Sequence, residues 1–283
     1  MKKLFLLCLG GLLFTQANGQ IKIGSDSDVL ASAKIEPYDS LSNWNFEKEV
    51  RKVLVSENEG ARQRAQKALF NKYLGQKLYV LPLSSFDKKS VEYDLFIRKI
   101  DSLSNKYYTI KRIESIIDPV FNTSYSSVKY KLTLVGTRGT VYTFTTTYDN
   151  LKTYTLLNGY YEKLKKLYIN KSFIYTGIAS GMNADEINEK LIHTAIDRKT
   201  GNQIELRIGE KWTCKDLMIF EDKYYQHLYF IYEDAKGRSI KVRVENEWDS
   251  FNDRNIIFNS CFKSEVDYLK MKLRIGNPSV KSL

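Results

Sequence analysis

One unit of this chain recurs, and its recurrence constrains the fold more than any other feature of the sequence. Residues 73–80 (YLGQKLYV) resemble residues 168–175 (YINKSFIY), and residues 268–275 (YLKMKLRI) form a third, similar segment. Apolar residues at helical spacing precede each segment, and β-branched or aromatic residues lie within the segments. The pattern therefore predicts a helix followed by a strand at three places along the chain.

Two hairpins also correspond to each other. Residues 130–146 and residues 228–244 each contain two strand-like runs around a turn, with Gly139 in the first turn and Gly237 in the second. Such runs around a glycine-bearing turn are typical of strand–turn–strand units. The two glycines lie 98 residues apart, which fits the spacing of the recurring segments. We therefore expect two β-rich modules, each with an amphipathic helix beside it.

The expected fold class is mainly β with accessory helices (α+β). Several short strands joined by hairpins suit a small closed barrel, which leaves no exposed sheet edge, and the module size resembles an SH3-like barrel. The second module is expected to add a hairpin at 192–208 and to close with the segment at 268–275 as a strand. The expected organisation is a signal peptide at 1–19, a leader and helical segment at 20–72, and two tandem SH3-like barrel modules at 73–167 and 168–283.

The first nineteen residues have the layout of a secretory signal peptide. Lys2 and Lys3 give a basic start, an apolar run extends to Phe14, and small residues lead to Gly19. The run is too short to span a bilayer, and no later segment has the roughly 18 uninterrupted apolar residues of a membrane helix. We therefore expect cleavage near Gly19 and an exported chain, periplasmic or extracellular, without a transmembrane segment.

The charge balance favours anionic partners. The 44 Lys and Arg residues against 33 Asp and Glu give a net charge of +11, and removing Lys2 and Lys3 with the signal peptide leaves +9. An anionic envelope glycan or another envelope protein is the expected partner, and nucleic acid is not expected outside the cytoplasm. A basic protein whose dispersed charge serves only solubility is the alternative.

Two cysteines, Cys214 and Cys261, remain after signal cleavage. An exported chain can oxidise such a pair to a disulfide. Two buried thiols that act as small apolar side chains are the alternative. Two cysteines alone do not complete a tetrahedral zinc site, and no histidine lies at ligand spacing from either one. No metal site is expected.

No convergent catalytic set is recognisable. Only His193 and His227 offer histidine chemistry, and Ser180 misses the Gly-x-Ser-x-Gly spacing of a nucleophile elbow by one position. Neighbouring carboxylates such as Asp185 and Glu186 point apart, whereas a glycosidase needs two that converge across a cleft. The sequence also lacks a phosphate loop or dinucleotide fingerprint, so no cofactor is expected.

Aromatic and basic side chains are the remaining binding candidates. Aromatic residues at a barrel mouth could stack on a ligand, and lysines interleaved with aromatics at 160–168 could hold an anionic glycan or a membrane surface. For the lysines, the alternative is a helix whose apolar face is core and whose charged ends are solvated. The aromatic candidates are Tyr108, Trp212 and Tyr225, and the basic candidates are Lys163, Lys165 and Lys166.

The signal peptide at 1–19 and the segments at 73–80 and 168–175 give the chain a recognisable layout. In this layout it resembles exported proteins of Gram-negative bacteria with tandem SH3-like β-barrel modules. The resemblance carries no functional residue across. Together with the missing catalytic set, it favours an exported, non-enzymatic binding or interaction protein of the bacterial cell envelope. The alternatives are an envelope glycan or peptide hydrolase with acids from separate loops, and a purely structural subunit.

Overall fold

The computed structural model is α+β, with several antiparallel sheets. Strands account for about 39% of the described residues and helices for about 34%. The predicted signal peptide at 1–19 and residues 24–41 of the predicted leader and helical segment lie outside the described residues. The structure describes residues 22–23, 42–54, 59–117, 128–177, 193–221, 224–244 and 257–276.

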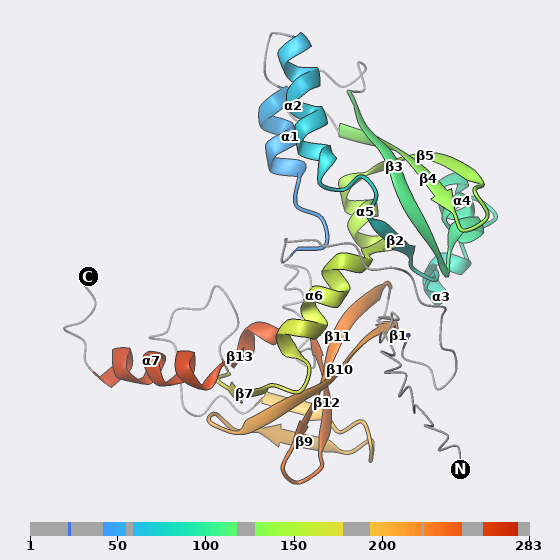
Figure 1. Ribbon diagram of the computed structural model, residues 1–283. Helices are drawn as coiled ribbons and strands as arrows, with labels where there is room; N and C mark the ends of the chain where they lie inside the picture. Colours follow the sequence, from blue (N-terminus) through green and yellow to red (C-terminus); the bar gives the residue numbers. More distant parts are fainter. Residues whose placement is uncertain are drawn as a thin grey trace, which may run out of the picture.

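The first sheet has five antiparallel strands (Figure 1). They are β2 (Lys77–Val80), β3 (Lys106–Ile117), β4 (Val128–Gly136), β5 (Val141–Thr147) and β6 (Thr155–Leu157). Their order in the sheet is β5-β4-β3-β2-β6. The short helix α5 (Tyr148–Tyr154) follows β5 and brings the chain back so that β6 pairs with β2.

The second sheet repeats this order with later strands. Its main strands are β7 (Ser172–Tyr175), β10 (Lys211–Glu221), β11 (Gln226–Asp234), β12 (Ser239–Arg243) and β13 (Phe262–Lys263). The order is β12-β11-β10-β7-β13, and the short β1 (Lys22–Ile23) pairs with β10 in parallel. A one-turn helix η3 (Asn259–Cys261) precedes β13, at the place that α5 takes before β6.

The expected extra hairpin forms a separate two-stranded sheet. It consists of β8 (His193–Ile196) and β9 (Gln203–Leu206). No sheet closes on itself among the described residues, so the structure holds open antiparallel sheets where closed barrels were expected.

Helices flank and connect the sheets. They are α1 (Glu47–Leu54), α2 (Glu59–Asn71), α3 (Ser85–Lys88), α4 (Leu95–Leu103), α6 (Asn158–Tyr168) and α7 (Glu265–Gly276). The helices α1 and α2 pack on each other, and α2 lies against β3. Phe46, just before α1, is fully buried and its ring contacts five other aromatic rings. This aromatic cluster anchors the helical segment to the first sheet.

The two sheets match in register as well as in order. Tyr108 of β3 is paired with a residue of β2, and Trp212 of β10 is paired with the corresponding residue of β7. Farther along these two long strands, one residue bulges out of the pairing, Lys111 in β3 and Lys215 in β10. These are the residues that correspond when residues 108–113 are aligned with residues 212–217.

Each sheet is also entered through the same turn. Gly75 after α2 has φ 82°, and Asn170 after α6 has φ 62°. Their N–H groups donate to the carbonyls of Ile110 (2.8 Å) and Cys214 (2.7 Å), next to the two bulges. Glycine and asparagine adopt this left-handed backbone at the lowest cost. The recurring segments therefore share their backbone geometry despite differing in most side chains.

Helix α6 lies between the two sheets (Figure 1). It contacts β2 and β6 on one side and β10 on the other. Tyr161 is fully buried, and its hydroxyl donates to the Leu217 carbonyl at 2.8 Å. One helix thus contributes core residues to both halves of the molecule.

The expectation that 268–275 forms a closing strand is wrong. These residues lie in α7, and β13 takes the closing position by pairing with β7. The Ser264 hydroxyl accepts from the Asp267 N–H (3.2 Å) and donates to its carboxylate (2.6 Å), which caps the helix. The alternating Leu269, Met271 and Leu273 suggested a strand, but the capped N-terminus favours a helix.

The connection between β2 and β3 in the first module is partly helical. It contains α3 and α4. Asp94 caps α4, because its carboxylate accepts from the N–H groups of Phe96 (2.7 Å) and Ile97 (3.2 Å). Ile97, Ile100 and Leu103 then turn one face of α4 into the core.

Candidate binding groove

A groove of about 650 Å³ runs between α2 and β3. This volume is within the range of small-ligand sites. Helical spacing places Gln63, Gln66, Lys67 and Phe70 on one side of α2, and four consecutive residues from Arg112 to Ser115 supply the opposite wall. Leu74, just beyond α2, completes the lining.

The groove combines an apolar floor with polar walls. Phe70 is 3% exposed and Ile113 is 6% exposed, so both belong to the core beneath the groove. Gln63 and Gln66 offer amide donors and acceptors, although the Gln63 amide also donates to Glu59 (3.2 Å). The Ser115 hydroxyl is buried and has no hydrogen-bond partner within the described chain.

The charges of the groove are not equivalent. Arg112 Nη2 lies 2.7 Å from Glu114 Oε1, so these two charges compensate each other. Lys67 forms no ion pair among the described residues and lines the groove from α2. Within the described lining, Lys67 is therefore the uncompensated charge available to an anionic group, with amide and hydroxyl groups in the same lining.

Two of the aromatic candidates are core residues. Tyr108 is 3% exposed, its ring lies edge-on to Tyr142, and its hydroxyl donates to the Leu103 carbonyl at 3.1 Å. Trp212 is fully buried in β10. These side chains occupy matched positions in separate sheets, and neither has a surface on which a ligand could stack.

Tyr225 differs from them because it is 40% exposed, in the turn between β10 and β11. Its ring contacts Tyr224 and the buried Tyr154 of α5. Tyr224 in turn lies edge-on to the exposed Phe86 of α3. Tyr225 therefore belongs to a contact between the two halves of the molecule.

The basic candidates follow α6. Lys165 is half-buried, with Nζ 3.6 Å from Glu162 Oε1 and 5.5 Å from the centre of the Tyr161 ring. Burial raises the pKa of Glu162, and Lys165 opposes this shift. Lys163 is half-buried and Lys166 is exposed. Tyr161 is core, as in the alternative interpretation of this segment as an amphipathic helix.

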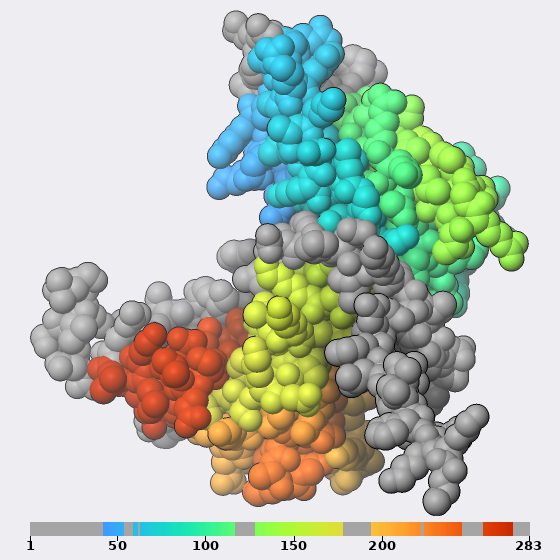
Figure 2. Space-filling view, viewed as in Figure 1, coloured from blue at the N-terminus to red at the C-terminus, as the bar shows by residue number. Residues whose placement is uncertain are grey.

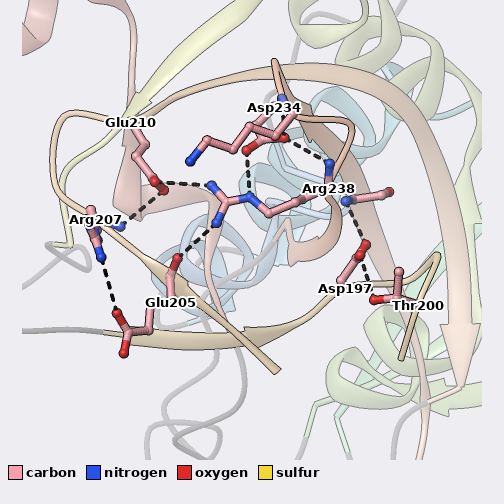
Figure 3. Close-up of polar contacts among 9 residues, drawn as sticks. Asp197, Thr200, Glu205, Arg207, Glu210, Asp234 and Arg238 are labelled. Carbon is pink, nitrogen blue, oxygen red and sulfur yellow. Dashed lines mark hydrogen bonds and ion pairs between the residues drawn. The ribbon is translucent and has the colours of Figure 1, made fainter. Parts of the chain in front are cut away.

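Arg238, Asp234 and Glu210 form an ionic cluster in the second half of the chain (Figure 3). Arg238 Nε donates to Asp234 (2.7 Å), and Arg238 Nη2 donates to Glu210 (3.1 Å). The guanidinium carbon lies 5.3 Å from the Trp212 ring centre, within the range of a cation–π contact. Arg238 therefore holds the β11–β12 turn over the indole, which makes this cluster a part of the fold.

Asp197 joins the β8–β9 hairpin to the second sheet (Figure 3). Its carboxylate accepts from the Ser239 N–H (2.9 Å), the Thr200 hydroxyl (2.8 Å) and the Lys199 N–H (3.2 Å). These hydrogen bonds, the one from Ser239 above all, lower the pKa of Asp197. The charged carboxylate is thus the form that stabilises this junction.

We expect this junction to make stability depend on pH. A folded pKa below the unfolded value of about 3.9 gives stabilisation that is complete above about pH 4 and is lost as the pH falls through the folded pKa. Asp197→Asn should therefore lower the urea midpoint at pH 7, and the difference from the wild type should shrink at about pH 3. Asp101→Asn, at an exposed site on α4, is the control. A difference for Asp197→Asn that does not change with pH would contradict this role.

Both cysteines of the described chain are buried free thiols. Burial raises the pKa of Cys214 to about 12 and the pKa of Cys261 to about 11. The sequence left a disulfide and two buried thiols as alternatives, and the structure contains the two buried thiols. Protonated and buried, they are unreactive near neutral pH.

The sequence did not indicate the groove residues. Apolar spacing in 59–71 identifies the buried side of α2, and Gln63 and Lys67 then look like ordinary solvated residues. Their significance depends on β3, which is more than thirty residues away in sequence. Only the packing of α2 on β3 brings the two walls together.

Comparisons with protein-family models, curated proteins and solved structures found no match. In the part of the chain that the structure describes, no helix has the length and apolarity needed to cross a membrane. The same residues include no group of three or more His, Cys, Asp or Glu side chains placed to hold a metal ion. The geometry of the groove is therefore the evidence for a ligand site there.

Proposed function

We propose that this chain is an exported binding protein of the bacterial cell envelope, and that the groove between α2 and β3 holds an anionic envelope glycan. The observation that carries the proposal is the groove itself, where the Lys67 cation and amide groups lie above an apolar floor. A sugar ring has apolar faces and hydroxyl edges, so such a lining suits it. Carboxylate or phosphate substituents on the glycan would pair with Lys67.

The two halves of the chain are, in this proposal, tandem SH3-like modules produced by duplication. In support of this, β2 lies between β3 and β6 in the first sheet, and β7 lies between β10 and β13 in the second. A short helix precedes the last strand of each sheet, β6 or β13. The matched bulges at Lys111 and Lys215 add a detail that strand composition alone does not require. Each module is bounded by an amphipathic helix, α2 or α6.

The export expected from residues 1–19 would bring the chain to the envelope. The positive net charge of the chain favours association with anionic glycans. Hydrolysis of the glycan would require two facing carboxyl groups. The described lining supplies one carboxylate, Glu114, which is already paired with Arg112. A binding role is therefore the better match.

We expect Lys67→Glu to weaken binding of carboxylated or phosphorylated wall oligosaccharides by about tenfold or more. Charge-assisted hydrogen bonds contribute about 1.5–3 kcal/mol, and 1.4 kcal/mol corresponds to a factor of ten in affinity. Isothermal titration calorimetry with oligosaccharides released from purified cell walls measures this change. Lys111→Glu is the matched control, because it makes the same charge change at an exposed bulge outside the groove lining. Equal losses in both variants, or no loss in Lys67→Glu, would contradict the groove assignment.

A further inference from the structure

Helix α7 exposes a stripe of large apolar side chains. Val266 is 61% exposed, Leu269 is 53% exposed and Leu273 is 72% exposed. Their spacing of three and four residues aligns them along one face of the helix. Single exposed apolar residues are ordinary on protein surfaces, but an aligned row on one helix marks an interaction surface.

The opposite face of α7 attaches the helix to the second sheet. Tyr268 and Met271 are half-buried, and the Tyr268 hydroxyl lies close to Gly209. The helix contacts β7 and β13, and Glu265 forms an ion pair with Lys211 (3.7 Å). The stripe therefore points outward from a helix whose other side is already occupied. Figures 1 and 2 show α7 standing out at the side of the molecule.

Cations accompany the stripe. Lys270 and Lys272 are exposed, and within the described chain neither forms an ion pair, although Lys272 Nζ lies 5.1 Å from the centre of the Tyr268 ring. Glu265 is paired with Lys211, whereas Asp267 keeps its charge while its carboxylate accepts from the Ser264 hydroxyl. Lys270 and Lys272 outweigh this one carboxylate, so the net charge beside the apolar row is positive. A partner that matches it must be both apolar and anionic.

We propose that α7 is an interfacial anchor that lies on the surface of an anionic lipid membrane. Val266, Leu269 and Leu273 would enter the boundary between headgroups and acyl chains, while Lys270 and Lys272 would pair with lipid phosphates. A helix of twelve residues lying flat in this way does not need to cross the bilayer. Lipid binding by α7 is independent of the glycan groove, which lies on the first sheet.

Vesicle co-sedimentation of residues 20–283 tests this proposal. The wild type should bind vesicles that contain phosphatidylglycerol and bind pure phosphatidylcholine vesicles more weakly. Leu269→Gln with Leu273→Gln should reduce binding to anionic vesicles by about tenfold or more, because it removes apolar contact without changing charge. Lys270→Glu with Lys272→Glu should also release the chain from anionic vesicles while leaving the apolar stripe intact.

The matched control replaces two apolar residues of similar exposure on the first module, Leu95→Gln with Val141→Gln. This variant should bind vesicles as the wild type does, and circular dichroism checks that every variant is folded. Unchanged binding after the α7 changes, or equal loss in the control, would overturn the proposal. Sedimentation analysis adds a further outcome. A wild-type dimer that becomes monomeric with Leu269→Gln and Leu273→Gln would assign the stripe to a second copy of the chain.

Discussion

Replacing Trp212 by alanine is expected to destabilise the folded chain by about 3–5 kcal/mol. The indole is fully buried in β10, faces β7 and lies beneath the guanidinium of Arg238. Alanine would leave a cavity that the surrounding sheet and its ionic cover fill only in part. Urea unfolding followed by circular dichroism measures the loss of stability.

The phenylalanine variant separates packing from polarity at this position. The Trp212 indole N–H is buried and has no hydrogen-bond partner in the described chain. Trp212→Phe therefore loses volume without losing a hydrogen bond, and we expect it to cost less than Trp212→Ala, about 1–2 kcal/mol. If Trp212 were instead a ligand contact, alanine would abolish envelope binding and leave the urea midpoint unchanged. That result would contradict the structural role.

Replacing Tyr161 by alanine is expected to have an effect of similar size, about 3–5 kcal/mol, and to affect both halves of the molecule. Tyr161 is fully buried on α6, which contacts strands of both sheets. Its hydroxyl donates to Leu217 in the second sheet. Loss of the ring should therefore weaken the first and second sheets together. Hydrogen exchange should show reduced protection of amides in both β2 and β10.

Tyr161→Phe is the matched control for this second prediction. It keeps the buried ring and removes only the hydrogen bond to the Leu217 carbonyl, so the expected cost is about 1 kcal/mol. Reduced protection in only one of the two strands after Tyr161→Ala would contradict a shared core. Equal stability losses in the alanine and phenylalanine variants would also contradict a shared core, because they would mean that the buried ring contributes nothing beyond its hydroxyl.

The repeated geometry was accessible from sequence because it depends on local signals. Gly139 and Gly237 both adopt left-handed backbone, with φ of 77° and 78°, at the hairpin turns that their spacing predicted. Likewise, alignment of residues 108–113 with residues 212–217 brings the two bulged lysines into correspondence. Turn chemistry and strand patterning act over a few residues, so a single sequence records them.

The failures concern burial and long-range packing. Tyr108 and Trp212 were expected at a ligand surface, but their matched positions face the core of each sheet. An aromatic residue in a strand has the same local pattern whether its ring binds a ligand or fills a core. The segment at 268–275 alternates as a strand would, yet the cap at Ser264 and the pairing of β13 leave it as a helix.

The groove and the α7 stripe could not be predicted from sequence for a different reason. Lys67 and Arg112 come together only because α2 packs on β3. The exposure of Leu269 depends on which face of α7 meets the second sheet. Neither relation is encoded within one segment, so spacing alone does not predict it.

Co-sedimentation of residues 20–283 with purified cell walls across a salt series tests the central claim most directly. We predict that binding weakens but persists at about 1 M salt, where the Debye length falls to about 3 Å. Lys67→Glu should lower the bound fraction at every salt concentration. Lys111→Glu should sediment with the walls as the wild type does. No binding would contradict the glycan groove. Binding that vanishes with salt and is lost equally in both variants would attribute the association to net charge, and it too would contradict a specific glycan groove.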